Sequence, residues 1–248
     1  STKAEKPTKP VEPTPTAETE EEGPLSLGSV EELESYRQTM RMSGRTGDEE
    51  YDMEIIAEFV REPRASRFVM KGRDETGQDS SMEMIQVGDA TYMQGPDGDW
   101  MSVTSSESED IMESGILDAE SGIDTDSCKY KGKDNVGGLQ AKHHFCDKAA
   151  LFSLPQVTGA IGAIESGQAD IWVSTKYGVP IKMVVDGKGK DKDGVEFESH
   201  WELEITDINK PIKIEAPEGV DRNVLPLDLA MMDGAYEVSA VTGFVGFK

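Results

Sequence analysis

The stretch from Val195 to Ile205, VEFESHWELEI, alternates apolar and polar side chains along almost its whole length. Apolar residues occupy the odd-numbered positions, with Ser199 as the exception, whereas four glutamates and a histidine fill the even-numbered positions. A period of two residues predicts an antiparallel β-strand that has one dry and one solvated face. The dry face must cover other apolar groups, and what it covers decides the function.

Similar segments recur along the chain and predict a meander of antiparallel strands with short connections. Clusters of glycine, proline and aspartate separate the first five of them, as expected for tight turns. Ser29 followed by Glu32 is similar to a capping box and indicates a short helix before the first strand. The predicted strands span Tyr36–Arg45, Glu50–Arg61, Arg67–Arg73, Met82–Val87, Thr91–Gln94, Gln168–Thr175, Pro180–Gly187 and Gly194–Thr206.

One longer helix is expected over Ala149–Glu165, where Leu154, Val157, Ile161 and Ile164 recur at three- and four-residue spacing. Pro155 is compatible with a helix start or a kink, so this segment also suits two short helices. Because a long twisted sheet tends to curl, we expect an α+β fold that is mostly antiparallel β. The predicted architecture is a curved, half-open β-barrel with short helices plugging its concave face around an apolar pocket.

Three regions differ in composition. Residues 1–24 consist of proline, threonine, glutamate and lysine with almost no apolar side chains, which predicts a disordered tether. We expect such a tether to lead to a membrane anchor upstream of Ser1, and an ordinary disordered terminus is the alternative. Residues 25–219 form the expected folded domain. Residues 220–248 depart from its pattern and are interpreted as an extension or as the start of a truncated second domain.

The formal net charge of −24 limits the choice of partners. Nucleic-acid binding is disfavoured because phosphate contacts need lysine and arginine, and flat adsorption to an anionic membrane is disfavoured for the same reason. No apolar run approaches the roughly 18 to 20 residues of a membrane-spanning helix.

Cys128 and Cys146 are the two cysteines of the chain and flank a hairpin-like segment whose turn lies near Lys133–Gly138. Cross-strand neighbours lie close enough for a disulfide, which would imply an oxidising compartment. Two buried thiols in a cytosolic protein are the first alternative. A zinc site with His143, His144 and Cys146 is the second, although adjacent strand residues point to opposite faces.

Catalytic signatures are missing from the sequence, which contains no nucleophile elbow, metalloprotease helix motif, phosphate-binding loop or dinucleotide fingerprint. The acidic segment Asp186–Gly194 resembles a calcium loop, but its lysines oppose a cation and it lacks the terminal glutamate. A hairpin turn is the preferred interpretation. We therefore expect a protein that is not an enzyme and that carries no cofactor or metal.

Methionine is abundant, with 12 residues in 248. Several of these methionines share a face within their predicted strands, and flexible thioether side chains suit a wall that adapts to variable apolar ligands. Core filling is the alternative. The expected pocket residues are Met53, Ile55, Phe59, Phe68, Met70, Met84, Trp172, Met183, Phe197 and Trp201.

Three stretches carry a resemblance to a known family. They are QADIWVSTKYGVPIKMVVDGKG (Gln168–Gly189), the segment Glu202–Pro217 with its INKPIKIEAP phrase, and the hairpin Tyr130–Phe145, which ends in His-Phe. Together they resemble the LolA/LppX–LprG-like bacterial envelope lipoproteins. The motifs are structural and not catalytic, and they cover about half of the expected folded domain.

The resemblance implies an extracytoplasmic, lipid-anchored lipoprotein at the cell surface or in the periplasm, which binds or carries a lipid or acyl chain without catalysis. Lipid or lipoprotein acyl chains are the expected ligands. An envelope sensor or surface-structural module that uses the same fold to bind a protein is the alternative. A cytosolic binding protein is a third hypothesis, which would require free thiols.

Overall fold

A computed structural model of the chain describes residues 25–73, 78–95, 98–104, 128–147, 163–191, 193–226, 237–238 and 245–246. A short 3-10 helix, Val30–Glu32, precedes the first strand and is capped by Ser29, as the sequence predicts. The strands are β1 (Ser35–Thr46), β2 (Glu49–Val60), β3 (Ala65–Arg73), β4 (Asp79–Val87), β5 (Ala90–Gln94), β6 (Trp100–Thr104), β7 (Lys129–Val136), β8 (Leu139–Asp147), β9 (Ala163–Ser174), β10 (Pro180–Lys190), β11 (Glu196–Thr206), β12 (Asp221–Pro226), β13 (Glu237–Val238) and β14 (Val245–Gly246).

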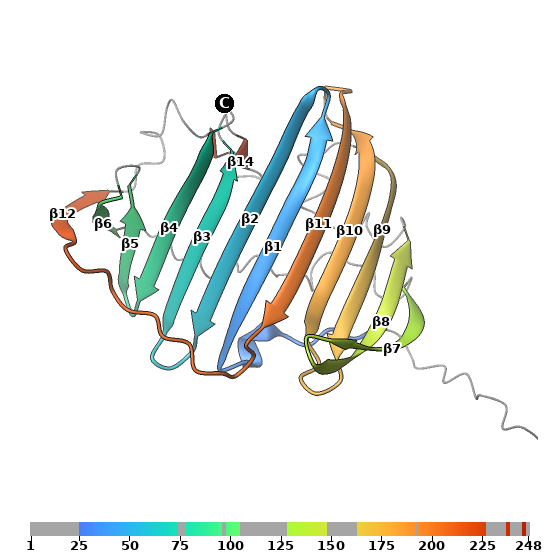
Figure 1. Cartoon of the computed structure of the whole chain (residues 1–248), viewed down its shortest axis with the longest axis horizontal. Helices are drawn as coiled ribbons and strands as arrows, with labels where there is room; N and C mark the ends of the chain where they lie inside the picture. The colour runs from blue at the N-terminus through green and yellow to red at the C-terminus, as the bar shows by residue number, and fades with distance from the viewer. Residues whose placement is uncertain are drawn as a thin grey trace, which may run out of the picture.

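Twelve of these strands form one broad, curved sheet (Figure 1). Strands β1 to β6 are neighbours in chain order, and so are β7 to β11. The two meanders are joined where β1 pairs antiparallel with β11 at the centre of the sheet. Strands β7 and β12 are the two edges and do not pair with each other, so the sheet stays open. The mostly antiparallel, half-open fold predicted from the sequence is confirmed.

The C-terminal part of the described chain extends this sheet. After β11, Asn209 anchors the turn because its backbone N–H donates to the Ser35 carbonyl at 2.8 Å and its Oδ1 accepts from the Glu34 N–H at 2.8 Å. The chain then runs along the ends of the strands to β12 (Figure 1), which pairs parallel with β6. The expected boundary at residue 219 thus falls just before a strand of the same sheet.

The expected helix over Ala149–Glu165 is wrong at its C-terminal end. Ala163, Ile164 and Glu165 begin β9, where Ile164 is the register partner of Gly189 on β10. Because β10 extends to Lys190, it supplies ladder partners for these residues, and this pairing overrides a weak helical periodicity. Residues 148–162 lie outside the described residues, so the predicted helical plug stays a prediction.

The sheet has two chemically distinct faces, since residues directly opposite each other on neighbouring strands share a face. The charged face carries cross-strand ion pairs. Glu58 accepts from Arg37 at 2.7 Å and from Arg67 at 3.3 Å, and Lys182 binds Glu202 at 2.6 Å. The glutamates at the even positions of β11 project from this face, as the alternation predicts.

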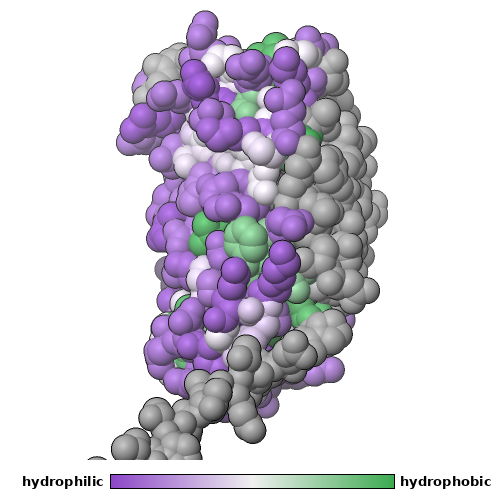
Figure 2. Space-filling view, turned by 90° about the vertical axis from the view of Figure 1, so that its right-hand side faces the viewer, coloured by the Kyte–Doolittle hydropathy of each residue, from purple (hydrophilic) through white to green (hydrophobic). Residues whose placement is uncertain are grey.

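The apolar face carries the odd-numbered residues of β11 and their register partners on both sides. Cross-strand pairing extends this face from β11 through β1 to β6 in one direction, and through β10 and β9 to β8 in the other. Figure 2 looks onto the β7–β8 edge, where the described side chains are mostly hydrophilic with a few hydrophobic ones between them. Exposed lysines on β7 suit an edge strand because their charge discourages pairing with another chain.

Candidate functional site

Methionine is confined to one face in the described part of the chain. Nine of the 12 methionines lie on described strands, and cross-strand register places all nine on the apolar face. Eight of them are on β1 to β6, and only Met183 is on the other half. We call these eight residues the methionine wall, which consists of Met40, Met42, Met53, Met70, Met82, Met84, Met93 and Met101.

The wall is built from direct cross-strand pairs rather than from isolated residues. Met42 is opposite Met53, and Met70 is opposite Met82. Met93 lies between Met84 on β4 and Met101 on β6, so three methionines follow one another across three strands. Such neighbours form a continuous surface of thioether side chains, because opposite Cβ atoms in a sheet are only about 5 Å apart.

The other half of the apolar face is packed with branched and small side chains. Ile171 is 0% exposed and Ile181 is 1% exposed, and the buried clusters of the described residues gather around β8 to β11. We call this the packed half, which consists of Cys146, Ala169, Ile171, Val173, Ile181, Leu203 and Ile205. On the methionine wall, by contrast, Met40, Met70 and Met82 are only half-buried.

Aromatic side chains bound the wall at one end. Tyr36 stacks on Phe59 with ring centroids 4.7 Å apart, and Phe59 meets Phe68 edge-on at 5.4 Å. Burial raises the pKa of Tyr36 to about 12, with a further increase from the nearby Glu31 charge. The phenol therefore stays neutral at physiological pH.

Tyr51 bounds the wall at the opposite end of β2. Its ring lies over Gly44, where an added Cβ would meet the tyrosine hydroxyl oxygen at 2.5 Å and the backbone of Glu198. Glycine is thus required at position 44 by space. Burial also raises the pKa of Tyr51, so both ends of β2 present neutral phenols or aromatic rings to the apolar face.

Nine of the ten pocket residues expected from the sequence lie on the apolar face. Six of them are on β2 to β4, Phe197 and Trp201 are on β11, and Met183 is on β10. Cross-strand register through β1 connects these strands. Trp172 differs, because its register partners are Lys182 and His143 on the charged face. Its ring stacks on His143 at 4.4 Å, and its Nε1 donates to Asp134 at 2.8 Å. We therefore leave Trp172 out of the proposed ligand-contacting set.

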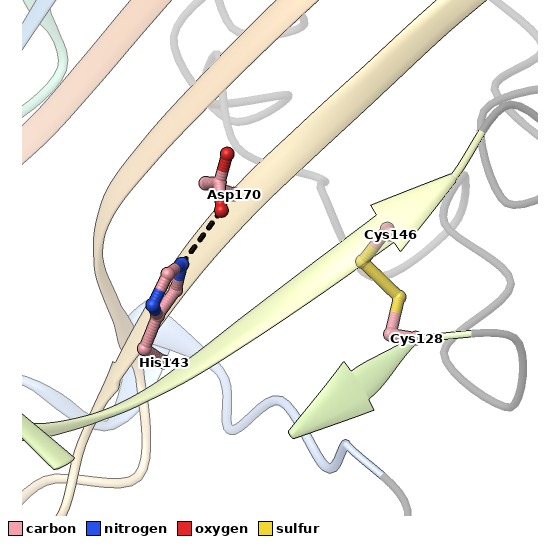
Figure 3. Close-up of a disulfide and its surroundings, with 4 residues drawn as sticks. All are labelled: Cys128, His143, Cys146 and Asp170. Carbon is pink, nitrogen blue, oxygen red and sulfur yellow. Dashed lines mark hydrogen bonds and ion pairs between the residues drawn. A yellow bond between two sulfur atoms is a disulfide. The ribbon is translucent and has the colours of Figure 1, made fainter. Parts of the chain in front are cut away.

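Cys128 and Cys146 form the disulfide predicted from the hairpin, with an S–S distance of 2.03 Å (Figure 3). The bridge links the residue before β7 to the end of β8, and the same strand carries His143, whose Nε2 contacts Asp170 on β9 at 2.6 Å. Because the Cys146 sulfur is consumed by the bridge, the free-thiol and zinc-site alternatives are wrong. No group of three or more metal-ligating side chains occurs among the residues that the structure describes.

The segment Asp186–Gly194 contains the end of β10 and the start of a hairpin turn, as the sequence favours. Asp191 Oδ1 accepts from the backbone N–H groups of Asp193 at 2.9 Å and Val195 at 2.8 Å. The aspartate thus stabilises the turn itself.

Several wall residues were missed by sequence reasoning. Met93 and Met101 lie on short strands, and β6 was not predicted at all. Met40 and Met42 share a face of one predicted strand, and Met82 lies on another. The sequence of a single strand does not indicate which of its two faces becomes part of the apolar face of the sheet. Gln38, a buried amide on β1 that shares a face with Met40 and Met42, is not a wall residue and was also missed, because a lone polar residue at an apolar position gives no signal of its own.

The chain is similar to one protein family and to several solved structures. Residues 20–124 match a protein family of unknown function, DUF6612. No similar sequence was found among curated proteins. The structure is similar to that of LprF from Mycobacterium bovis, at 16% identity and a TM-score of 0.46, over 76% of this chain and 91% of that one.

A second similar structure is the Mycobacterium tuberculosis lipoprotein LppX, at 16% identity and a TM-score of 0.43, over 75% of this chain and 91% of that one. A DUF1329 family protein from Desulfovibrio piger is more distant, at 12% identity and a TM-score of 0.27, over 75% of this chain and 89% of that one. One of these similar structures, LppX, bears the name of the lipoprotein group that the sequence motifs resemble. Within the described residues, no helix combines the length and hydrophobicity needed to cross a bilayer.

Proposed function

We propose that the protein binds an acyl-chain ligand against the methionine wall and performs no covalent chemistry on it. The observation that carries this proposal is the placement of all nine described methionines on one face, eight of them on a half that is less tightly packed than its neighbour. A wall of this kind suits a ligand that is apolar and variable in shape, because thioether side chains adapt to irregular surfaces at little cost.

The expected affinity comes from burial of the chain. Each methylene removed from water contributes about 0.8 kcal/mol, so an acyl chain needs no charged anchor on the apolar face. The charged face supports a binding role rather than a catalytic one, because several of its carboxylates are held in ion pairs. Glu58 bridges Arg37 and Arg67, and Glu54 contacts both Arg41 and Lys71.

The disulfide supports an extracytoplasmic location, since such bonds persist in oxidising compartments. With the resemblance to envelope lipoproteins, this favours a protein held at the cell surface or in the periplasm by a lipid anchor upstream of Ser1. Release of the protein from membranes by detergent but not by salt would test the anchor in the full-length protein.

Ligand binding is tested by extracting gently purified protein with organic solvent and identifying lipids by mass spectrometry. A parallel titration with a fluorescent fatty acid compares wild type with Met70→Gln on the wall and with Lys71→Gln, the adjacent residue on the charged face. We expect Met70→Gln to weaken binding on the order of 10-fold, because it sets an amide against the chain. Lys71→Gln should bind like wild type.

Two results would contradict the proposal. One is a protein that carries no extractable lipid and does not bind the fatty acid. The other is an equal loss of affinity in Met70→Gln and Lys71→Gln, since a ligand on the apolar face has no contact with Lys71. Circular dichroism on each variant separates lost binding from lost folding.

The alternative function, a protein-binding envelope module with no lipid cargo, is favoured by one observation. Met42 is 3% exposed and Met53 is 7% exposed, so part of the wall is already buried. A wall filled by protein side chains needs no ligand. In that case the fatty-acid titration gives no binding, while the purified protein stays folded and free of lipid.

A further inference from the structure

One polar side chain lies among the apolar residues at the junction of the methionine wall and the packed half. Gln38 is on β1, at the same parity as Met40 and Met42, and is 2% exposed. Its register partners are Ala57 on β2 and Ile205 on β11. The amide therefore projects from the apolar face at the centre of the sheet, between two apolar neighbours that are themselves 1% and 3% exposed.

The Nε2 donor of Gln38 is buried without a hydrogen-bond partner among the described residues. Burying an amide donor without an acceptor is unfavourable, and an apolar side chain of the same size would suit this position better for folding alone. Buried polar groups in native proteins are nearly always paired. An unpaired donor on an apolar face therefore indicates a partner that arrives from outside the chain.

The chemistry of that partner follows from the surroundings. The donor is neutral, and the arginines of β1 (Arg37, Arg41 and Arg45) alternate with Gln38 and so project from the opposite face. No cation on β1 thus lies beside Gln38 to compensate a buried carboxylate. A neutral oxygen acceptor attached to an apolar chain fits this site, and a carbonyl oxygen is the acceptor that acyl chains carry.

We propose that Gln38 donates a hydrogen bond from Nε2 to the carbonyl oxygen of an acyl ligand and so positions the ligand's polar end at the junction of the wall and the packed half. This inference rests on the proposed function and adds a positioning residue to it. Because Gln38 is almost fully buried, a ligand that reaches it lies inside the molecule rather than on its surface.

The test uses diphenylhexatriene, a fluorescent hydrocarbon without a carbonyl, to report on the wall. Methyl decanoate, decanoic acid and dodecane are then used to displace it from wild type and from Gln38→Met. We expect Gln38→Met to weaken the binding of methyl decanoate on the order of 10-fold, which is the effect of losing one hydrogen bond from a buried donor. Diphenylhexatriene and dodecane should keep wild-type affinity within about twofold, because neither contains an acceptor.

The two acyl ligands distinguish the source of the carbonyl. If only the affinity for methyl decanoate falls in Gln38→Met, the ligand is an esterified lipid. If only the affinity for decanoic acid falls, the ligand is a free fatty acid. If both affinities fall, Gln38 binds any acyl carbonyl. If ester, acid and dodecane all keep their wild-type affinities, the role of Gln38 is overturned while acyl-chain binding stands. If wild type binds neither diphenylhexatriene nor any of the three ligands, the proposed function and this inference both fall.

Gln86→Met is the matched control, because Gln86 is also buried on the apolar face, on β4 at 6% exposure. It should leave the preference for ester over dodecane unchanged, and an equal loss in this variant would contradict a specific role for Gln38. A thermal melt adds a second readout. Removal of an unpaired buried donor should raise the melting temperature of ligand-free Gln38→Met, whereas a large decrease would assign Gln38 a structural role and overturn the proposal.

Discussion

The methionine wall and the packed half lie on the same face of the same sheet but are built from different side chains. The packed half uses branched and small residues such as Ile171, Ile181 and Ala169, which are at most 1% exposed. The wall uses long, unbranched methionines, and several of them are only half-buried. Strand pairing is similar in both halves, so the difference lies in the side chains alone.

This difference separates two tasks within one sheet. Branched side chains have few rotamers and fill a defined space, which favours a single packed arrangement. Methionine has three rotatable bonds and tolerates changes in the surface against which it packs. The packed half is therefore suited to hold the fold together, and the wall is suited to meet a variable partner.

The largest expected effect is a difference in stability between matched substitutions in the packed half and on the wall. Ile171→Ala in the packed half should lower the free energy of unfolding by about 4 kcal/mol, because it leaves a cavity in a fully buried cluster. Met70→Ala on the wall should cost about 1 kcal/mol, because the side chain is only half-buried. Urea denaturation of both variants measures the difference. Equal losses would mean that the wall is as tightly packed as its neighbour.

A somewhat smaller effect is expected from the disulfide, which belongs to the packed half. Replacing Cys128 and Cys146 together by alanine should lower the free energy of unfolding by about 3 kcal/mol, since the bridge closes a short loop. Binding of diphenylhexatriene to the wall should remain within about twofold of wild type. Reduction of the wild-type protein with dithiothreitol is the control and should give a similar loss of stability. Loss of binding in the folded double variant would show that the two halves are coupled.

The smallest effect is expected on the charged face of the sheet, behind the packed half. The hydrogen bond from Lys182 lowers the pKa of Glu202, and the same bond raises the pKa of Lys182 above 10.5. The contribution of Glu202 is thus present above its ordinary pKa near 4.5 and is lost as the pH falls through the lowered folded-state value. The contribution of Lys182 is present below 10.5 and is lost at higher pH.

Lys182→Gln should therefore cost less than about 1 kcal/mol at pH 7, because both side chains are partly solvated. The difference from wild type should shrink as the pH falls below 4.5. Urea denaturation at pH 7 and at pH 3 measures both values. A difference that stays constant across this range would contradict the ion pair as the source of the effect.

Much of the sheet was predictable from local patterns. The alternation over Tyr36–Arg45 gave a strand that the structure extends by one residue at each end, and the turn near Lys133–Gly138 gave the β7–β8 hairpin and its disulfide. These features depend on residues close in sequence, where period-two alternation and turn residues act directly.

Features that depend on distant partners were missed or wrong. Strand β12 forms only because it pairs with β6, and the segment Ala163–Glu165 is extended because β10 continues to Lys190. Trp172 was expected in the pocket, but it alternates with Ile171 and Val173 along β9 and pairs with Lys182 and His143, so it lies on the charged face. The alternation along β9 separates Trp172 from Ile171 and Val173, but only the pairing with neighbouring strands shows which of the two faces carries the methionines.

The sequence by itself determined that this chain forms one-sided antiparallel strands, since each strand carries its own alternation of apolar and charged residues. It also placed the methionines at matching parity within their own strands. Only the tertiary structure decided that eight of them meet on one half of one face, and that Gln38 projects into the same face without a partner. The physical reason is that parity is a local property of one strand, whereas the assembly of a wall depends on register between strands far apart in the chain.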